Sequence, residues 1–359
     1  MNRLSLAITT VTAFSLFGLA QSSPKPVSQA KSSSKVPPSL TMVDIIKIRS
    51  EPADGFSVAH PLRCDADGNI FLRVQPEVEP AIRKFDSSGV QKVLFKPSTI
   101  PDMRVEMAAY FSIDGHGAIH QLVGASFTDW YVVTYRSDGA FQSKISLHLE
   151  FQFRPFQLAT FPSGELLISG LKRDNDSKNH VRLPFTGIFA GDGTLLKEVV
   201  LKDDETLNKM ATAGDPAIVP EGRRSGNTAI EGGDMVAGAD GNVYIMRKLS
   251  PATIYAISSG GEVVRQFRVD PNDPDFLPVS MQIASNRIAV VFLRSHAEEK
   301  TLPKDVIVKI VDLEGRDLAT YGHLGEYGIA LTCYSPIRER FTFVTTTDNY
   351  LGFAVAEPR

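Results

Sequence analysis

Short runs of aliphatic and aromatic residues recur along the chain, and each follows a turn-forming pair of residues. The clearest copies are Asp67–Leu72 and Asp240–Ile245, in which Asp-Gly-Asn precedes the apolar run. Weaker copies follow turns at positions 114, 163, 286 and 338, so that successive copies lie 47, 49, 77, 46 and 52 residues apart. Four of these five spacings are close to the roughly 40 to 50 residue period of propeller blades.

A second hairpin pattern lies between successive copies. In each case two short β-type runs flank a tight turn that contains glycine, which adopts positive φ without a steric clash. Each repeat therefore predicts two hairpins, or four short antiparallel strands, and such a unit is one propeller blade. The five turns are Ser88-Gly89, Asp138-Gly139, Asp192-Gly193, Gly260-Gly261 and Glu314-Gly315.

The sixth copy is followed by one strand only, over residues 350–355, whereas an unmatched strand is predicted at the other end, over residues 42–49. We therefore predict an all-β fold, a six-bladed β-propeller with four antiparallel strands per blade. The N-terminal strand would close the last blade and leave neither terminal edge exposed. A pair of β-sandwiches is the alternative, but sandwiches have no reason to leave complementary strands at opposite ends of the chain.

The N-terminal residues have a different character from the repeats. One positive charge, at Arg3, precedes an apolar stretch over residues 4–19 and the small residue Ala20, which is the pattern of a secretory signal peptide at 1–20. An uncleaved membrane anchor is the alternative, although no apolar run reaches the roughly 18 to 20 residues of a spanning helix. Residues 21–41 are rich in Ser, Pro and Lys and read as a flexible linker. We expect a secreted or periplasmic propeller over residues 42–359 that does not span a membrane once it is processed.

The repeats resemble the NHL-type six-bladed β-propellers. The resemblance rests on Asp65–Phe71 with Ile82–Gly89, and on Ala239–Tyr244 with Ile254–Gly260. The Pro-Gly-Val opening and the Asn-x-Arg-Ile step of that family are absent from this sequence. The resemblance implies the fold and leaves the activity open, because some relatives are amidating lyases or lactonase-like hydrolases and many are binding platforms.

The charge balance narrows the class of ligand. The chain has 38 basic and 41 acidic residues, a net charge of −3, which disfavours a nucleic-acid partner. Basic residues nevertheless recur where the second strand of a blade reaches the face that carries the longer loops. If they converge on the propeller axis, they form a positive funnel for an anionic ligand or an acidic peptide, whereas solvated charges at strand ends are the alternative. These residues are Arg73, Lys172, Arg173, Arg247, Lys248 and Arg294.

The 77-residue spacing reflects an insertion at about residues 202–233, which contains Arg223 and Arg224. A connection this long in a compact domain is typical of a functional or a disordered segment. Both interpretations stay open, and the functional one makes the insertion a lid or a partner-contact arm on the long-loop face.

Signatures of catalysis and of metal binding are weak. The Asp65-x-Asp67-x-Asn69 pattern lacks the Gly and Glu of a calcium loop, so we interpret it as a blade turn. His116 and His120 have no third ligand nearby in the sequence, so we interpret them as ordinary surface or strand histidines. Three carboxylates that precede innermost strands, Glu106, Asp234 and Glu326, would surround the axis and hold calcium if the protein were a lactonase-like hydrolase. The Glu-Gly-Pro signature expected for such a hydrolase appears only as Glu51–Ala53.

The two cysteines occupy matching positions. Cys64 ends the innermost strand of the first blade and Cys333 ends that of the sixth blade, and these blades are neighbours where the ring closes. A disulfide between them would lock the ring in an oxidising compartment, provided that their Cα atoms lie within roughly 7 Å.

We therefore expect an exported, non-catalytic β-propeller that binds a protein or a small anionic ligand on its long-loop face and needs no cofactor. The alternative is a calcium-dependent lactonase-like hydrolase or lyase that acts at the channel mouth, so that the question of catalysis stays open. A cell-envelope adaptor that binds only proteins is a third interpretation.

Overall fold

The chain is described by a computed structural model over residues 37–48, 57–75, 81–173, 182–207, 228–294, 305–323, 328, 330–347 and 350–359. The predicted signal peptide and most of the predicted linker lie outside these residues, as does the central part of the insertion, and those interpretations stay predictions. The described residues belong to one compact unit, Pro37–Arg359.

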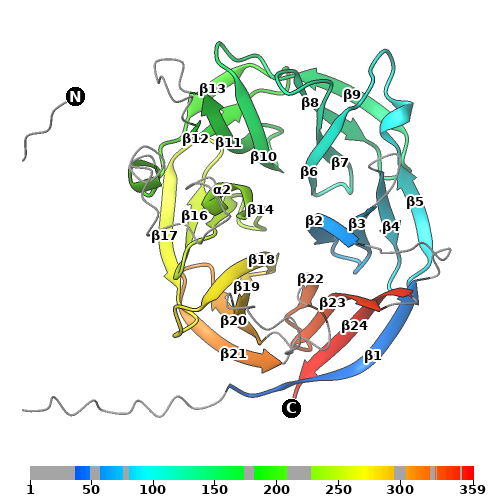
Figure 1. The fold of residues 1–359 in the computed structure, drawn as a ribbon, viewed down its shortest axis with the longest axis vertical. Coiled ribbons are helices and arrows are strands. Elements are labelled where there is room, and N and C mark those ends of the chain that lie inside the picture. Colours follow the sequence, from blue (N-terminus) through cyan, green and yellow to red (C-terminus); the bar gives the residue numbers. More distant parts are fainter. Residues whose placement is uncertain are drawn as a thin grey trace, which may run out of the picture. The chain divides into compact units, whose positions relative to one another are not determined.

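Six four-stranded antiparallel sheets form a ring (Figure 1), which confirms the prediction of a six-bladed β-propeller. In the first five blades the strands follow the chain from the axis outward. The strands of these blades are β2 (Ser57–Cys64), β3 (Ile70–Gln75), β4 (Ile82–Phe85) and β5 (Gln91–Phe95) in blade one; β6 (Met107–Ile113), β7 (Ile119–Gly124), β8 (Trp130–Tyr135) and β9 (Phe141–Ser146) in blade two; β10 (Phe153–Thr160), β11 (Leu166–Arg173), β12 (Arg182–Phe189) and β13 (Leu195–Glu198) in blade three; β14 (Asp234–Ala237), β15 (Val243–Arg247), β16 (Ala252–Ile257) and β17 (Val263–Val269) in blade four; and β18 (Phe276–Ala284), β19 (Arg287–Arg294), β20 (Val306–Asp312) and β21 (Asp317–His323) in blade five.

The sixth blade contains both ends of the described chain. Its inner strands are β22 (Ala330–Ser335), β23 (Arg340–Thr347) and β24 (Tyr350–Pro358), and its outermost strand is β1 (Leu40–Ile48). β1 pairs antiparallel with β24 from Leu40 opposite Pro358 to Ile48 opposite Leu351, as predicted for a ring closed by the N-terminal strand. The strand begins two residues before the expected Met42, so the end of the predicted linker belongs to the ring.

Local hydrogen bonds explain why the turns form where Asp and Gly occur. In the first turn, the Asp65 carboxylate accepts the backbone N–H groups of Asp67 at 3.1 Å and of Asn69 at 2.9 Å, and Gly68 has a φ of 78°. The Asp65-x-Asp67-x-Asn69 pattern is therefore a blade turn. Because the four strands of a blade alternate in direction, such turns lie on one face of the ring, and the longer connections lie on the other face.

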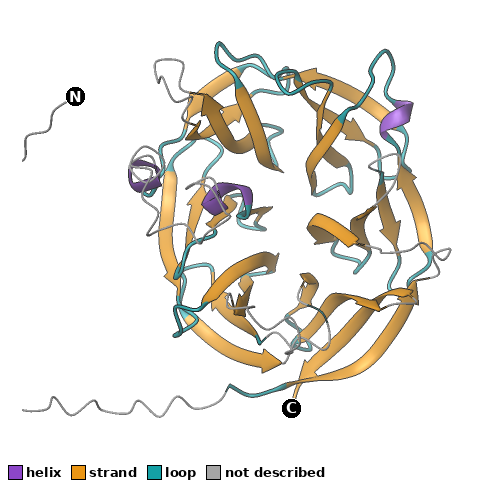
Figure 2. Cartoon of the chain, viewed as in Figure 1, coloured by secondary structure: helices purple, strands orange, loops and turns teal. Residues whose placement is uncertain are grey.

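Apolar side chains fill the space between neighbouring blades. The middle strands are the most buried, since every residue of β15 and of β16 is buried, whereas β17, an outer strand, consists mainly of exposed and partly buried positions. Very few described residues are helical (Figure 2): a 3₁₀ turn spans Pro97–Thr99, residues 204–207 are helical, and the short helix α2 (Thr228–Glu231) lies beside the inner end of blade four. None of the helices found in the described ranges is long and apolar enough to cross a membrane.

Candidate functional site at the axial channel

The innermost strand of each blade borders the axis of the ring (Figure 1), and most of these strands contain a bulge. The bulges of β6, β10, β18 and β22 each add one residue relative to the neighbouring strand. In β2, four residue steps from Ala59 to Arg63 lie opposite only two steps of β3, so this bulge adds two residues. Bulges redirect side chains, and the widest one places His60 and Arg63 in blade one.

A buried ion pair spans the ring below the channel mouth. Arg63 of blade one and Asp234 of blade four come from opposite positions in a ring of six, and the Arg63 Nη2 atom lies 2.6 Å from the Asp234 Oδ1 atom. The Tyr110 hydroxyl of blade two donates to the same Asp234 oxygen and accepts from Arg63. The second Asp234 oxygen accepts the Met281 N–H of blade five at 2.9 Å. We call the side chains of Arg63, Tyr110 and Asp234 the axial network.

The contacts within the axial network stabilise the charge states of its side chains. Burial opposes ionisation of Asp234, but the Arg63 guanidinium and the hydrogen bonds outweigh it, so the pKa of Asp234 is lowered. Burial likewise opposes the charge of Arg63, and the Asp234 carboxylate outweighs it and raises the Arg63 pKa. The pKa of Tyr110 is raised well above its ordinary value, chiefly by burial. The ion pair therefore stays charged, and Tyr110 stays a neutral hydrogen-bond donor.

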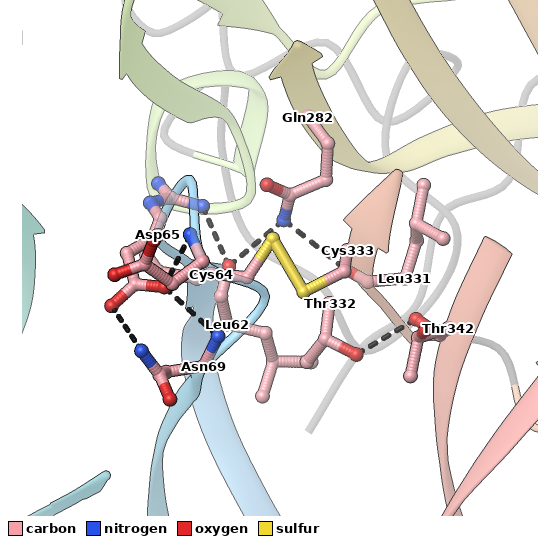
Figure 3. Close-up of a disulfide and its surroundings, with 11 residues drawn as sticks. Leu62, Cys64, Asp65, Asn69, Gln282, Leu331, Thr332, Cys333 and Thr342 are labelled. Carbon is pink, nitrogen blue, oxygen red and sulfur yellow. Dashed lines mark hydrogen bonds between the residues drawn. A yellow bond between two sulfur atoms is a disulfide. The ribbon is translucent and has the colours of Figure 1, made fainter. Parts of the chain in front are cut away.

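The remaining inner strands are also joined at the axis. The Gln282 side chain of β18 donates to the carbonyl oxygens of Leu62 at 2.9 Å and of Leu331 at 3.2 Å, and so connects blade five to blades one and six (Figure 3). Beside it, the structure pairs Cys64 with Cys333 in a disulfide, with their Cα atoms 5.4 Å apart (Figure 3). Polar contacts thus join the innermost strands across the axis of the ring.

His60 lies on the long-loop side of the axial network, and its side chain is exposed to solvent. Protein atoms nevertheless surround the imidazole on most sides, and this burial is the main cause of a lowered pKa. The Asp234 carboxylate acts in the opposite direction, whereas Arg63, Lys248 and Arg73 lower the pKa further through their positive charges. His60 is therefore an accessible, neutral group among three cations and one carboxylate.

Arg73 is the unusual member of this set. Its side chain is only 5% exposed, and the guanidinium donates to the backbone carbonyl oxygens of His60 and Ala108. Its Nε atom is buried without a hydrogen-bond partner, and among the described residues no carboxylate lies within ion-pair distance of Arg73. Burial lowers the pKa of Arg73 to about 10, so the group stays charged at neutral pH. Arg73 is thus a buried positive charge next to the backbone of His60, without an acidic partner among the described residues.

The other cations predicted for the funnel have partners of their own. Arg247 is completely buried and joins blades three and four, because it donates to Ser169 at 3.2 Å and to Asp204 at 3.1 Å. Arg294 stacks over the Phe276 ring at 4.5 Å and donates to the carboxylates of Asp273 and Asp305. Arg73, Arg247 and Arg294 each donate hydrogen bonds to groups of the blades around them, and a shared positive funnel stays a prediction.

The predicted residues of blade three end its second strand, β11, and have partners within the same blade. Lys172 forms an ion pair with Glu198 at 2.7 Å and lies over the Phe185 ring, and Arg173 donates to Gln152 at 3.0 Å. Lys248 is half-buried and, of the predicted set, only Lys248 and Arg73 affect His60. Arg223 and Arg224 lie outside the described residues.

Two of the three carboxylates predicted for the alternative metal site belong to the described residues. Glu106 is exposed, both oxygens of Asp234 accept protein hydrogen bonds, and Glu326 lies outside the described residues. Within the described ranges no three His, Cys, Asp or Glu side chains form a group that would hold a metal ion. His116 is exposed at a turn, and His120 contacts Asp114 at 3.2 Å, in keeping with ordinary blade positions.

Sequence reasoning missed His60, Arg63 and Tyr110. The available signal was their location in the innermost strands that the repeat pattern predicts. Nothing near Arg63 or Tyr110 in the sequence indicates that each contacts Asp234, because Asp234 lies 171 residues from Arg63 and 124 residues from Tyr110.

Comparisons with known proteins add little beyond the fold. No protein-family model and no curated protein matches the chain, so the NHL resemblance stays a prediction. Among solved structures, a gluconolactonase from Xanthomonas campestris is similar at 10% identity, covering 89% of this chain and 94% of that one, with a TM-score of 0.48. An inactive virginiamycin B lyase from Staphylococcus aureus is similar at 10% identity, covering 88% and 99% with a TM-score of 0.45. A protein of unknown function from Bacteroides caccae is similar at 13% identity, covering 77% and 85% with a TM-score of 0.47. Similarities this weak carry no argument about the ligand or the activity of this chain.

Proposed function

We propose that this protein is a non-catalytic binding propeller that takes a small anionic ligand at the long-loop mouth of its axial channel. The observation that carries the proposal is the buried charge of Arg73, which has no carboxylate partner among the described residues and lies behind the accessible side chain of His60. The predicted secretory signal supports a site of action outside the cytoplasm.

A buried charge without a counter-charge is costly, because the low dielectric of the interior does not screen it. The Arg73 guanidinium itself is covered, so its influence on a ligand is electrostatic rather than by contact. Its field, together with that of Lys248, extends to the point where His60 is exposed. An anion beside His60 would supply a negative charge near Arg73, and we propose a small ligand because the axial network occupies the centre of the ring.

The alternative, a calcium-dependent hydrolase or lyase, would need several free carboxylate oxygens near the axis. Asp234 accepts hydrogen bonds from Arg63 and Met281 through its two oxygens, and Glu106 is exposed away from this network. No specific observation favours the alternative.

Isothermal titration of the protein with sulfate and with acetate tests the proposal, and Arg73→Gln is the informative variant. Removing one positive charge near the bound anion should weaken binding by roughly tenfold, since that corresponds to about 1.4 kcal/mol. Arg73→Lys, which keeps the charge, should retain most of the affinity.

Arg265→Gln is the matched control, because Arg265 belongs to an exposed ion-pair group with Asp240 and Glu314 at the turn face. It should bind the anions as the wild type does. The proposal is wrong if neither anion binds the folded wild-type protein, or if the two Gln variants lose affinity equally.

A further inference from the structure

The His60 imidazole is exposed at the innermost strand of blade one, and no hydrogen bond joins it to another of the described residues. Its backbone carbonyl accepts a hydrogen bond from Arg73, and His60 lies within the two-residue bulge of β2. We infer that anion binding at the mouth is coupled to uptake of a proton by His60, so that the site binds its anion more tightly as the pH falls. The inference rests on the proposed anion site.

The charged and titratable groups around His60 come from every inner element that packs near it. Arg63 belongs to β2, Arg73 to β3, Tyr110 to β6 and Asp234 to β14, and Lys248 directly follows β15. Asp234 is matched by Arg63, whereas Arg73 has no acidic partner among the described residues. The electrostatic surroundings of an unliganded His60 are therefore positive.

The direction of the coupling follows from these surroundings. Burial and the neighbouring cations hold the pKa of the unliganded His60 below its ordinary value, so the ring is neutral near pH 7. A bound anion offsets the cations and favours the imidazolium, which has two N–H donors and no acceptor. If the anion raises the affinity of His60 for a proton, protonation must raise the affinity for the anion by the same factor.

Titration of the full chain with sulfate between about pH 5.5 and pH 7.5 tests the inference, because sulfate does not itself titrate in this range. Affinity should increase by several-fold, and by no more than tenfold, for each unit of decreasing pH. Repeating the titration in two buffers with different ionisation enthalpies measures proton uptake directly. We expect uptake of a fraction of one proton per sulfate bound.

His60→Gln should abolish both the proton uptake and the pH dependence. His116→Gln is the control, because His116 is exposed at a turn on the opposite face, and this variant should keep the wild-type slope. If His60→Gln fails to fold, the proton uptake measured on the wild-type protein still tests whether anion binding is coupled to protonation.

The outcomes separate this inference from the proposed function. Sulfate binding that is independent of pH and takes up no proton overturns the coupling and leaves the anion site intact. A pH slope that survives in His60→Gln also overturns the coupling, because another group would then titrate. Absence of sulfate binding at every pH overturns both.

Discussion

Asp234 is the residue on which the centre of the ring depends. Its two oxygens accept hydrogen bonds from blades one, two and five, and all the groups involved are buried. The sequence identified Asp234 as an acidic residue near the axis, and named it as a calcium ligand only for the alternative of a lactonase-like hydrolase. Its partner Arg63 could not be predicted, because only the tertiary fold brings this residue across the ring to the carboxylate.

The first prediction concerns this ion pair. Asp234→Asn keeps the size of the side chain but leaves Arg63 charged and buried, which should lower the free energy of unfolding by about 3–5 kcal/mol. Because the pKa of Asp234 is lowered in the fold, its contribution is complete above the ordinary Asp pKa of about 4 and is lost as the pH falls further. Urea unfolding at neutral and at acidic pH should show the difference between wild type and variant shrinking in acid.

Asp138→Asn provides the comparison, because Asp138 pairs with Arg136 at the surface, where both side chains are more than half exposed. This variant should unfold at the same urea concentration as the wild type at neutral pH. Equal effects of the two substitutions would mean that the axial network contributes no more than a surface pair.

At the scale of the elements, the blades are readable from the sequence because their turns are local. Asp and Gly at fixed offsets mark most of the hairpins, and alternation or continuous burial of apolar residues then distinguishes outer strands from inner ones. The bulge of β2 was not predicted, since a bulge is defined by the pairing of two strands and leaves no mark in either strand alone. The position of His60 depends on that bulge, so it could not be predicted from the sequence.

The second prediction tests whether turns also set the packing between blades. Gly68 and Gly193 both have positive φ, at 78° and 88°. A Cβ on Gly68 would meet no atom within 4 Å, whereas one on Gly193 would meet the Ser146 carbonyl oxygen and, at 2.8 Å, the Ile145 side chain of blade two. Gly68→Ala should cost only the backbone strain of about 1–2 kcal/mol.

Gly193→Ala should cost a further 1–3 kcal/mol or so, because a neighbouring blade must move to admit the methyl group. Chemical denaturation of the two variants measures this difference. If both glycines give the same loss of stability, the turns do not fix the spacing of blades two and three.

At the scale of the whole molecule, the ring is closed at two distances from its axis. On the outside, β1 completes the sheet of β24, and Pro38 reaches further, accepting the Gly322 N–H of blade five at 3.0 Å. On the inside, the Cys64–Cys333 disulfide joins the innermost strands of blades one and six. Both closures join the two ends of the same ring, so each limits the separation of blade one from blade six.

The third prediction measures the inner closure. The disulfide links residues 269 apart in sequence, and cross-linking so long a segment restricts the unfolded chain strongly. The double variant Cys64→Ser with Cys333→Ser should therefore lose about 2–5 kcal/mol of unfolding free energy while keeping the β-rich circular dichroism spectrum, because β1 still closes the outer edge. Adding a reductant should lower the stability of the wild type by a similar amount and leave the double variant unchanged. A wild-type protein whose stability does not respond to the reductant, although its thiols become free to alkylation, would show that the outer strand alone holds the ring closed.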